Sequence, residues 1–296
     1  MAKIEKVGVV GCGLMGRGIA QVCAAAGYAT VVREIAQEPL DRGMAAIEKG
    51  LDKAVERGKL EEAEKKATLA NLRGTTELED LYDVDLVIEA IVEDIDVKNE
   101  LFGKLDASCP DETIFASNTS SLTVTEMAAA TERADRFVGL HFFNPVPVMK
   151  LVEVVRTGAT SDAAFERAFE FARSLGKEPI ACRDNSGFVV NRLLVPYMLD
   201  AIRAYEEGIG SIEDIDKGMT LGTGYPMGPF TLGDFVGLDT LYYITEIMYE
   251  EYREKRFASP PLLKRMFQAG QHGRKSGRGF YDYSGETPVV NEFVKR

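Results

Sequence analysis

A histidine and a glutamate lie on two consecutive apolar segments and could act as an acid–base pair. His141 comes at the end of the apolar run that begins at Phe137, and two prolines interrupt the backbone soon after it. Glu153 lies within the apolar segment Leu151–Val155, where a buried acid needs a partner. If the segments are antiparallel neighbours, the two side chains lie symmetrically about Pro147 and meet. A histidine so held could take a hydroxyl proton and return it near neutral pH, whereas an unpaired buried ring is more often structural.

The N-terminal segment carries a glycine pattern typical of dinucleotide binding. The apolar strand Val7–Val10 leads into Gly-Cys-Gly-Leu-Met-Gly and an amphipathic run. Gly11 permits the tight turn, Gly13 lets the backbone approach a pyrophosphate, and Gly16 allows close packing of helix on strand. A purely structural glycine turn is the alternative, but the strand, turn and helix context favours a cofactor site. The predicted contacts in this turn are Gly11, Gly13, Leu14, Met15 and Gly16.

An acid at the end of the next strand indicates which nicotinamide cofactor binds. Glu34 stands 18 residues after Gly16, close to the offset of about 20 residues expected for the acid that binds the adenosine ribose. Its carboxylate should repel a 2′-phosphate, whereas the adjacent Arg33 could meet that phosphate. NAD(H) is therefore the predicted cofactor, with NADP(H) as the alternative.

Further polar residues follow strands whose carboxyl ends should face the ligand. Glu93 and Lys98 could line the cofactor channel, although acids are also favoured at helix starts. Ser120 could hold the reacting oxygen and Asn118 the cofactor, although such residues are also ordinary in turns and caps. Asn191 could reach a cleft between two domains. No glycine-flanked elbow surrounds Ser120, so the sequence does not support a covalent serine mechanism.

Short apolar runs alternate with helical patterns through roughly the first 180 residues. This pattern predicts an α/β, Rossmann-like, doubly wound and mostly parallel sheet. Helical patterns at Pro39–Arg57 and Glu61–Leu72 follow one another and predict a helical hairpin inserted beside the sheet. The predicted strands are Val7–Val10, Thr30–Arg33, Leu86–Glu89, Ile114–Ala116, Phe137–Leu140, Leu151–Val155 and Pro179–Cys182.

A smaller all-α domain is predicted to follow, because the strand signal fades after residues 184–187. The expected boundaries are 1–185 for the dinucleotide-binding domain and 186–296 for a helical substrate-cleft and dimerisation domain. Pro196 should kink the helix Phe188–Tyr205 or mark its true start. The segment Phe230–Tyr249 predicts a helix that is apolar on nearly all sides, which indicates either a subunit interface or a central core helix.

The composition argues against several classes of protein. The chain has 296 residues and a formal net charge of -12, which disfavours nonspecific binding to nucleic acid or an anionic membrane. Four scattered cysteines and two histidines suggest neither a disulfide framework nor a metal site. The N-terminus shows no apolar signal core, and no run approaches the ~20 apolar residues of a membrane span. The cytoplasm is the expected compartment.

Several motifs occur together along the chain: Gly-Cys-Gly-Leu-Met-Gly, Ser-Asn-Thr-Ser-Ser, His-Phe-Phe-Asn-Pro, Lys-Leu-Val-Glu-Val, Gly-Phe-Val-Val-Asn-Arg, Tyr-Pro-Met-Gly-Pro and Gly-Arg-Lys-Ser-Gly-Arg-Gly-Phe-Tyr. In these motifs the sequence resembles the short-chain 3-hydroxyacyl-CoA dehydrogenases, particularly the stand-alone bacterial 3-hydroxybutyryl-CoA dehydrogenases. The resemblance implies a catalytic dyad of His141 and Glu153, with Ser120 and Asn191 holding the substrate and Asn144 supporting the site. It implies that the cofactor is also contacted by Glu93, Lys98, Asn118, Ser120, Asn144 and Lys275.

A basic stripe on the predicted hairpin has two interpretations. Lys49, Lys53 and Arg57 recur every fourth residue and share one helix face. Such charges are usually solvated, but the family places the coenzyme A phosphates near this helix, which implies that Lys53 and Arg57 bind them. The chain departs from the family at Glu34, where Asp is frequent, and at Ser186, where Pro is frequent. The first departure leaves the cofactor choice open, and the second touches no predicted reacting atom.

The resemblance implies an enzyme that interconverts 3-hydroxybutyryl-CoA and acetoacetyl-CoA by hydride transfer, as a homodimer built through the helical domain. One alternative is a dehydrogenase of longer 3-hydroxyacyl-CoA esters or of free hydroxy acids. A free-acid enzyme would use a carboxylate-binding Arg or a catalytic Lys in place of the basic stripe. The other alternative is a nucleotide-binding structural protein without activity, which the intact acid–base pair disfavours.

Overall fold

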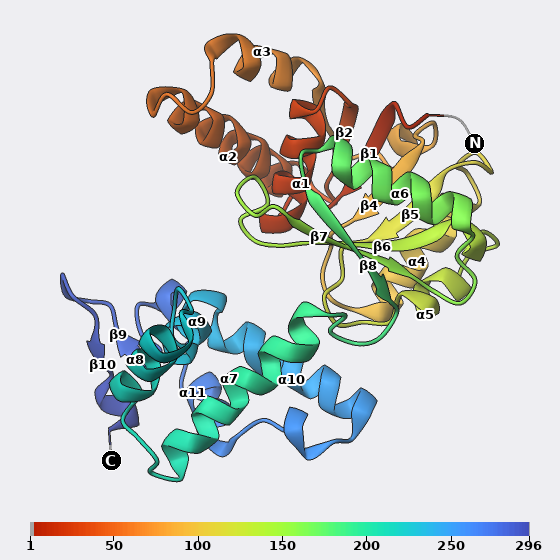
Figure 1. Cartoon of the computed structure of the whole chain (residues 1–296). Helices are drawn as coiled ribbons and strands as arrows, with labels where there is room; N and C mark the ends of the chain where they lie inside the picture. Colours follow the sequence, from red (N-terminus) through yellow and green to blue (C-terminus); the bar gives the residue numbers. More distant parts are fainter. Residues whose placement is uncertain (1–2, 296) are drawn as a thin grey trace. The chain divides into compact units, whose positions relative to one another are not determined.

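The chain divides into two compact units between Phe188 and Val189. The computed structural model describes residues 3–295. The first unit is built on a large sheet, and the second is mainly helical. Figure 1 labels the elements of both units.

Within the described part of the chain, eight strands form the sheet of the first unit: β1 (Lys6–Val10), β2 (Ala29–Arg33), β3 (Leu72–Thr75), β4 (Leu86–Glu89), β5 (Ile114–Ser117), β6 (Phe137–Phe142), β7 (Leu151–Arg156) and β8 (Glu178–Arg183). Their order is β3-β2-β1-β4-β5-β6-β7-β8, and every neighbouring pair is parallel except β6 with β7. The central strands β4, β5 and β6 are buried along their whole length, as expected for a sheet covered on both faces. The predicted Rossmann-like sheet is confirmed.

The helices of the first unit begin at defined residues because side chains cap several of them. These helices are α1 (Leu14–Ala25), α2 (Gln37–Glu56), α3 (Glu62–Ala70), α4 (Ile95–Asp106), α5 (Val124–Ala129) and α6 (Asp162–Ser174), with the short helices η1 (Glu79–Leu81) and η2 (Ala134–Arg136). Asp94 accepts two backbone N–H groups at the start of α4, and Asp184 accepts two at the start of α5. These caps satisfy donors that a helix leaves unpaired at its N-terminus.

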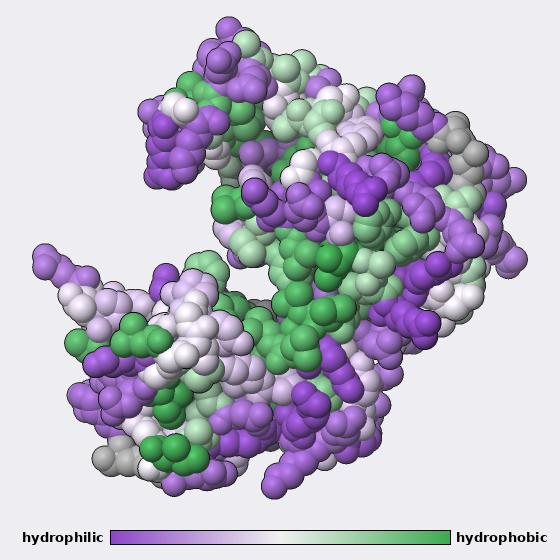
Figure 2. Space-filling model, in the orientation of Figure 1, coloured by the Kyte–Doolittle hydropathy of each residue, from purple (hydrophilic) through white to green (hydrophobic). Residues whose placement is uncertain are grey.

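The predicted helical hairpin is formed by α2 and α3. Lys65 of α3 forms an ion pair with Asp52 of α2 at 2.5 Å. Glu61 and Glu64 form a capping box at the start of α3. Figure 1 shows the far end of the hairpin projecting from the sheet, and Figure 2 shows hydrophilic side chains gathered over its tip.

One strand of the sheet, β3, was not predicted. The predicted helix Glu61–Leu72 ends at Ala70, and Leu72 begins β3, which pairs in parallel with β2. This strand lies at the edge of the sheet, has four residues and contains Gly74. A short edge strand with partly exposed residues lacks the apolar run by which a buried strand is recognised.

The second unit contains α7 (Val190–Glu206), α8 (Ile212–Thr223), α9 (Pro229–Val236), α10 (Leu238–Tyr252), α11 (Pro261–Gln268), η3 (Lys255–Phe257), η4 (Arg274–Ser276), η5 (Glu292–Val294) and a small hairpin of β9 (Tyr281–Asp282) and β10 (Val289–Val290). It has its own core, in which Leu199, Phe230, Leu241 and Leu263 are fully buried. Among residues 3–295, no helix combines the length and apolar character that a membrane crossing requires.

One expectation for the helical unit was wrong, and one of the two alternatives for Pro196 is excluded. The predicted helix Phe230–Tyr249 is two helices, α9 and α10, which meet at Gly237. Gly237 has φ +101, a conformation that glycine adopts readily and that ends a helix. Pro196 lies inside α7 and does not mark its start, since the helix begins at Val190.

Candidate active site

His141 and Glu153 pair directly across β6 and β7. The antiparallel register places them opposite each other, as their symmetry about Pro147 predicts, and Nδ1 of His141 lies 2.7 Å from Oε2 of Glu153. His141 is 6% exposed and Glu153 is 0% exposed. β6 runs to Phe142, so His141 lies within the strand. Because the carboxylate holds Nδ1, Nε2 is the ring nitrogen left to exchange a proton.

Two aromatic rings and a thiol surround this pair. The ring centroid of Phe143 lies 4.5 Å from that of His141, and the ring of Phe188 lies 5.6 Å from it. Sγ of Cys182 lies 3.9 Å from Oε1 of Glu153. Such apolar surroundings strengthen the attraction between a carboxylate and a protonated imidazole. Neither Phe188 nor Cys182 could be assigned to the site from sequence, because their contacts join segments far apart in the chain.

A buried lysine holds the loop that follows β6. Asn144, which is exposed, is joined to Pro145 by a cis peptide bond. Nζ of Lys177 donates to the carbonyl oxygens of Val146 at 2.5 Å and Met149 at 2.9 Å. Burial lowers the pKa of the Lys177 ammonium. Lys177 could not be recognised from sequence, since no local pattern links it to the loop that it holds.

The predicted residues Asn118 and Ser120 lie in the loop after β5. Oδ1 of Asn118 accepts the N–H of Phe142 at 2.9 Å, so this side chain is fixed beside the strand of His141. Ser120 is half-buried, and its N–H donates to Oε1 of Glu93 at 3.3 Å. The sheet therefore brings this loop together with the His141–Glu153 pair at the carboxyl edge of β5 and β6.

The glycine turn has the geometry predicted for a dinucleotide site. Gly11 has φ +98, and a Cβ on Gly16 would lie 1.9 Å from the carbonyl oxygen of Gly11. Gly13 precedes α1 without a side-chain cap, and a Cβ there would meet nothing within 4 Å. The first N–H groups of α1, which begins with Leu14 and Met15, therefore face the open side of the turn. A diphosphate fits such a helix start, where unpaired N–H groups and the helix dipole both favour an anion.

Glu34 holds the same turn from the end of β2. Its Oε2 accepts the N–H of Cys12 at 2.8 Å, and its Oε1 accepts the N–H of Ile35 at 2.7 Å. Nε of Arg33 donates to the carbonyl oxygen of Thr76 at 3.2 Å. The carboxylate is thus fixed beside the turn while Arg33 is engaged elsewhere, which favours a ribose with a free 2′-hydroxyl over a 2′-phosphate.

Glu93 and Lys98 form an ion pair, but their side chains differ greatly in exposure to solvent. Nζ of Lys98 lies 3.2 Å from Oε2 of Glu93 and 2.5 Å from Oε1 of Glu89. The side chain of Lys98 is 1% exposed, whereas that of Glu93 is 33% exposed. Burial opposes ionisation of Glu93, but Lys98 and a hydrogen bond from Thr119 outweigh it and lower the pKa of Glu93. Direct contact of Lys98 with a cofactor stays a prediction.

The other predicted residues belong to other elements. Asn191 is half-buried near the start of α7, and Lys275 of η4 forms an ion pair with Asp239 at 2.5 Å. Lys53 of α2 and Arg57, which directly follows α2 as its C-cap, are exposed, and neither forms an ion pair with the described residues. The roles of these four residues stay predictions.

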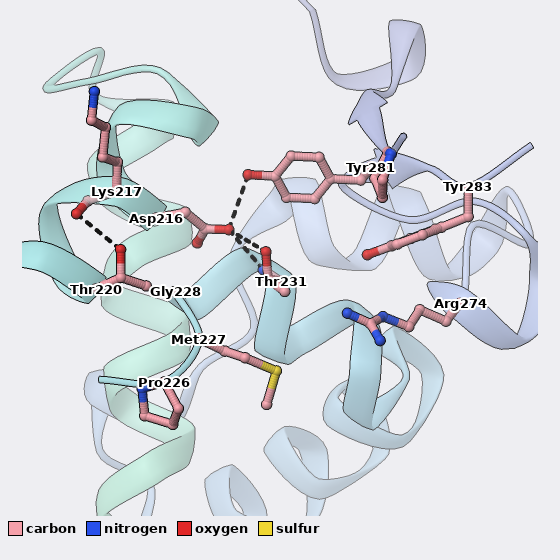
Figure 3. Close-up of a pocket in the computed structure, with 11 residues that line it drawn as sticks. Asp216, Lys217, Thr220, Pro226, Met227, Gly228, Thr231, Arg274, Tyr281 and Tyr283 are labelled. Carbon is pink, nitrogen blue, oxygen red and sulfur yellow. Dashed lines mark hydrogen bonds between the residues drawn. The ribbon is translucent and has the colours of Figure 1, made fainter. Parts of the chain in front are cut away.

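Two cavities of the described chain contain none of the predicted site residues. One, of about 420 Å³, lies in the first unit around Arg133 and the ends of α4 and α5. The other, of about 280 Å³, lies in the second unit among α8, α9, η4 and β9 (Figure 3). Here Asp216 accepts the N–H groups of Phe230 and Thr231 and the hydroxyl of Tyr281, so it caps α9. Within residues 3–295, no group of three or more His, Cys, Asp or Glu could hold a metal ion.

A dinucleotide turn that shares one sheet edge with a buried acid–base pair is the arrangement of an NAD-dependent oxidoreductase. A family model described as the NAD binding domain of 3-hydroxyacyl-CoA dehydrogenase matches residues 6–185, and one described as its C-terminal domain matches residues 187–283. The chain belongs to the 3-hydroxyacyl-CoA dehydrogenase family. NAD(H) is the cofactor, and the predicted family, enzyme class and preferred cofactor are confirmed.

Relatives of high identity cover almost the whole chain. A 3-hydroxybutyryl-CoA dehydrogenase of Mycobacterium tuberculosis is 52% identical over 95% of this chain and 99% of the relative. The human mitochondrial hydroxyacyl-coenzyme A dehydrogenase is 48% identical over 95% of this chain and 91% of its own length. Among solved structures, FadB2 of M. tuberculosis has a TM-score of 0.94 at 52% identity and covers 96% of this chain and 100% of that one. The (S)-3-hydroxybutyryl-CoA dehydrogenase PaaH1 of Ralstonia eutropha has a TM-score of 0.92 at 43% identity, with coverage of 96% and 100%.

Proposed function

We propose that the chain interconverts 3-hydroxybutyryl-CoA and acetoacetyl-CoA with NAD(H), and that His141 carries the proton. The observation that carries this proposal is the direct pairing of His141 with buried Glu153 at 2.7 Å. The names of the bacterial relatives support the choice of a four-carbon thioester.

The chemistry assigns each part of the pair a task. Bound NAD(H) supplies or accepts the hydride at C3 of the thioester. In the direction of reduction, protonated His141 donates from Nε2 to the oxygen on C3, which becomes the hydroxyl group. In the direction of oxidation, Nε2 accepts that proton. Glu153 orients the ring through Nδ1 and stabilises its protonated form, as a positioned acid–base catalyst requires.

Polar residues around the pair would hold the two ligands. We assign Ser120 and Asn191 to the substrate, with Asn144 supporting the site. Glu34 would bind the adenosine ribose, and its fixed position beside the turn supports this. The proposed cofactor contacts are Gly11, Gly13, Leu14, Met15, Gly16, Glu34, Glu93, Lys98, Asn118, Ser120, Asn144 and Lys275.

The coenzyme A end of the substrate would bind the hairpin. Lys53 and Arg57 are exposed cations four residues apart at the C-terminal end of α2. Phosphates attract such cations, and the net charge of -12 makes a local basic site necessary for an anionic substrate.

The proposed domains are residues 1–185 for the dinucleotide and 186–296 for the substrate cleft and dimerisation. Large apolar side chains exposed in the second unit support a homodimer: Ile209, Leu221 and Tyr243. Light scattering after size exclusion tests this assembly. We also propose the cytoplasm as the compartment, since all four cysteines are buried free thiols.

Nicotinamide consumption with acetoacetyl-CoA tests the proposal. We expect turnover with NADH, less with NADPH, and none with free acetoacetate. Faster turnover of longer 3-oxoacyl-CoA esters would change the substrate assignment. Tight NADH binding without turnover of any thioester or free acid would reject the enzymatic function.

A further inference from the structure

A buried carboxylate, Glu89, lies beneath the loop that carries Asn118 and Ser120. Glu89 is the last residue of β4 and is 0% exposed. Its Oε1 accepts the N–H of Ile91 at 2.8 Å and Nζ of Lys98 at 2.5 Å. Its Oε2 accepts the hydroxyl of Ser117 at 2.6 Å. A buried carboxylate is tolerated only when paired and hydrogen-bonded, and Glu89 meets both conditions while facing no solvent.

The partners of Glu89 hold the loop from two sides. On one side, Ser117 Oγ accepts the N–H of Thr119 at 3.1 Å. On the other side, Lys98 pairs with Glu93, and Oε1 of Glu93 accepts the hydroxyls of Thr119 and Ser121 and the N–H of Ser120.

This network reaches the strand of the catalytic histidine. The N–H of Asn118 donates to the carbonyl oxygen of Glu89 at 2.8 Å. The side chain of Asn118 accepts the N–H of Phe142, the neighbour of His141, at 2.9 Å. A displacement at Glu89 therefore reaches Glu93 and Asn118 through hydrogen bonds, and reaches His141 through its covalent neighbour Phe142.

We propose that Glu89 is a positioning residue, which acts through Lys98 and Ser117 to set the places of Glu93, Asn118 and Ser120 for cofactor and substrate. Charge explains why a second carboxylate is needed. Lys98 is buried and requires a counterion, and Glu89 supplies one that faces no ligand. Lys98 then attracts Glu93 less strongly, so the carboxylate of Glu93 stays partly exposed to solvent. This inference rests on the proposed function where it concerns turnover, but not where it concerns NADH binding.

Three variants separate positioning from simple stabilisation. Glu89→Gln keeps an acceptor for Ser117 and Ile91 but leaves Lys98 with Glu93 as its only carboxylate. Glu89→Gln/Lys98→Met removes both fully buried charges and leaves only the partly exposed Glu93 without its cation, which restores most of the stability. Asp85→Asn is the matched control, since Asp85 precedes the opposite end of β4 and accepts the N–H groups of Glu5 and Lys6.

The measurements are the Kd of NADH from its fluorescence, kcat and KM with acetoacetyl-CoA, and the melting temperature. We expect Glu89→Gln to raise the Kd of NADH about tenfold and to lower kcat about tenfold. Each change corresponds to the loss of one charge-assisted hydrogen bond. The double variant should regain the melting temperature while its Kd stays raised. Asp85→Asn should lower the melting temperature and leave the Kd within about twofold.

Recovery of the Kd together with the melting temperature in the double variant would overturn the proposal, as would normal NADH binding by Glu89→Gln. If the unaltered protein binds NADH but turns over no thioester, the substrate assignment fails, and the Kd values still decide the role of Glu89.

Discussion

Gly43 of α2 packs directly on Cys12 of the glycine turn. A Cβ built on Gly43 would lie 2.2 Å from Sγ of Cys12 and 2.5 Å from its carbonyl oxygen. The helix that carries Lys53 and ends just before Arg57 is therefore in contact with the turn proposed to bind the pyrophosphate. No side chain larger than hydrogen fits at residue 43 unless one of the two elements moves.

Gly43→Ala should weaken both the fold and NADH binding. Overpacking of a filled contact costs about 1–3 kcal/mol, and relief of the clash would shift the glycine turn. We expect the free energy of unfolding to fall by that amount and the Kd of NADH to rise several-fold. Urea unfolding and NADH fluorescence measure the two effects.

Gly50 provides a control on the same helix. A Cβ there would come no nearer than 4.0 Å to another residue, at Oε1 of Gln21. Gly50→Ala should therefore stabilise the protein by about 0.5–1 kcal/mol, because alanine loses less backbone entropy in a helix. Equal behaviour of the two variants would show that the contact with Cys12 is not tight.

His141→Gln should lower kcat by about 10²- to 10⁴-fold, because positioned acid–base catalysis contributes that much. The Kd of NADH should stay within about twofold, since glutamine leaves the glycine turn intact.

Glu153→Gln should cause a smaller loss of kcat, because the amide can still contact the ring but carries no charge. His272→Gln is the control and should turn over normally, since the ring of His272 stacks on Phe267 and lies 3.2 Å from its carbonyl oxygen, in a different unit from the His141–Glu153 pair. An unchanged kcat in His141→Gln would remove His141 as the proton carrier.

The acid–base pair could be predicted from sequence because its two strands follow one another. Strands joined by a short connection usually pair, so equal spacing about Pro147 was enough to predict the register of His141 and Glu153. The glycine turn was predictable for a similar reason, since Gly11, Gly13 and Gly16 act within one strand, turn and helix.

Contacts between distant elements could not be predicted in this way. Glu89 looks like the last residue of an apolar strand, and its partners Lys98 and Ser117 are recognised only once α4 and β5 are in place. Lys177 likewise holds a loop about 30 residues earlier in the chain. Gly237 lies inside the predicted helix Phe230–Tyr249; one glycine costs a helix only about 1 kcal/mol, so only its positive φ reveals the break.

Lys53→Ala/Arg57→Ala should raise the KM for acetoacetyl-CoA and leave kcat nearly unchanged. The two exposed cations would touch only the distant phosphates, so their loss removes binding that is equal in the ground and transition states. We expect a rise of about tenfold at low salt, which shrinks as salt screens the attraction between these cations and the phosphates in the unaltered protein. Steady-state kinetics at several salt concentrations measure this effect.

A shortened substrate provides the control for that variant. The N-acetylcysteamine thioester of acetoacetate lacks the nucleotide and its phosphates. Its KM should be the same for the variant and the unaltered protein. A parallel rise in both KM values would place the defect in the acyl site and reject the phosphate assignment.

Asp234 should make the helical unit less stable as the pH rises. This carboxyl is buried and accepts the N–H groups of Phe280 and Tyr281 and the hydroxyl of Tyr283. Burial raises its pKa from the ordinary 3.8 to about 6 despite those hydrogen bonds, and the like charge of Asp216 adds to the effect. The folded protein then binds this proton more tightly than the unfolded chain, so the free energy of unfolding falls between about pH 4 and 6. The loss should be on the order of 3 kcal/mol.

Comparison with Asp234→Asn isolates this contribution, since the amide does not titrate. Unfolding in urea from pH 4 to 7 should show a decline in the unaltered protein that is absent from the variant. Asp282→Asn in the same unit should change the pH dependence with the opposite sign. Hydrogen bonds from Ser284 lower the pKa of Asp282, so its contribution is present at neutral pH and lost as the pH falls. Parallel stability curves for the unaltered protein and Asp234→Asn would contradict the prediction. Asp234 would then titrate as an ordinary carboxyl, because its hydrogen bonds fully offset the cost of burying its charge.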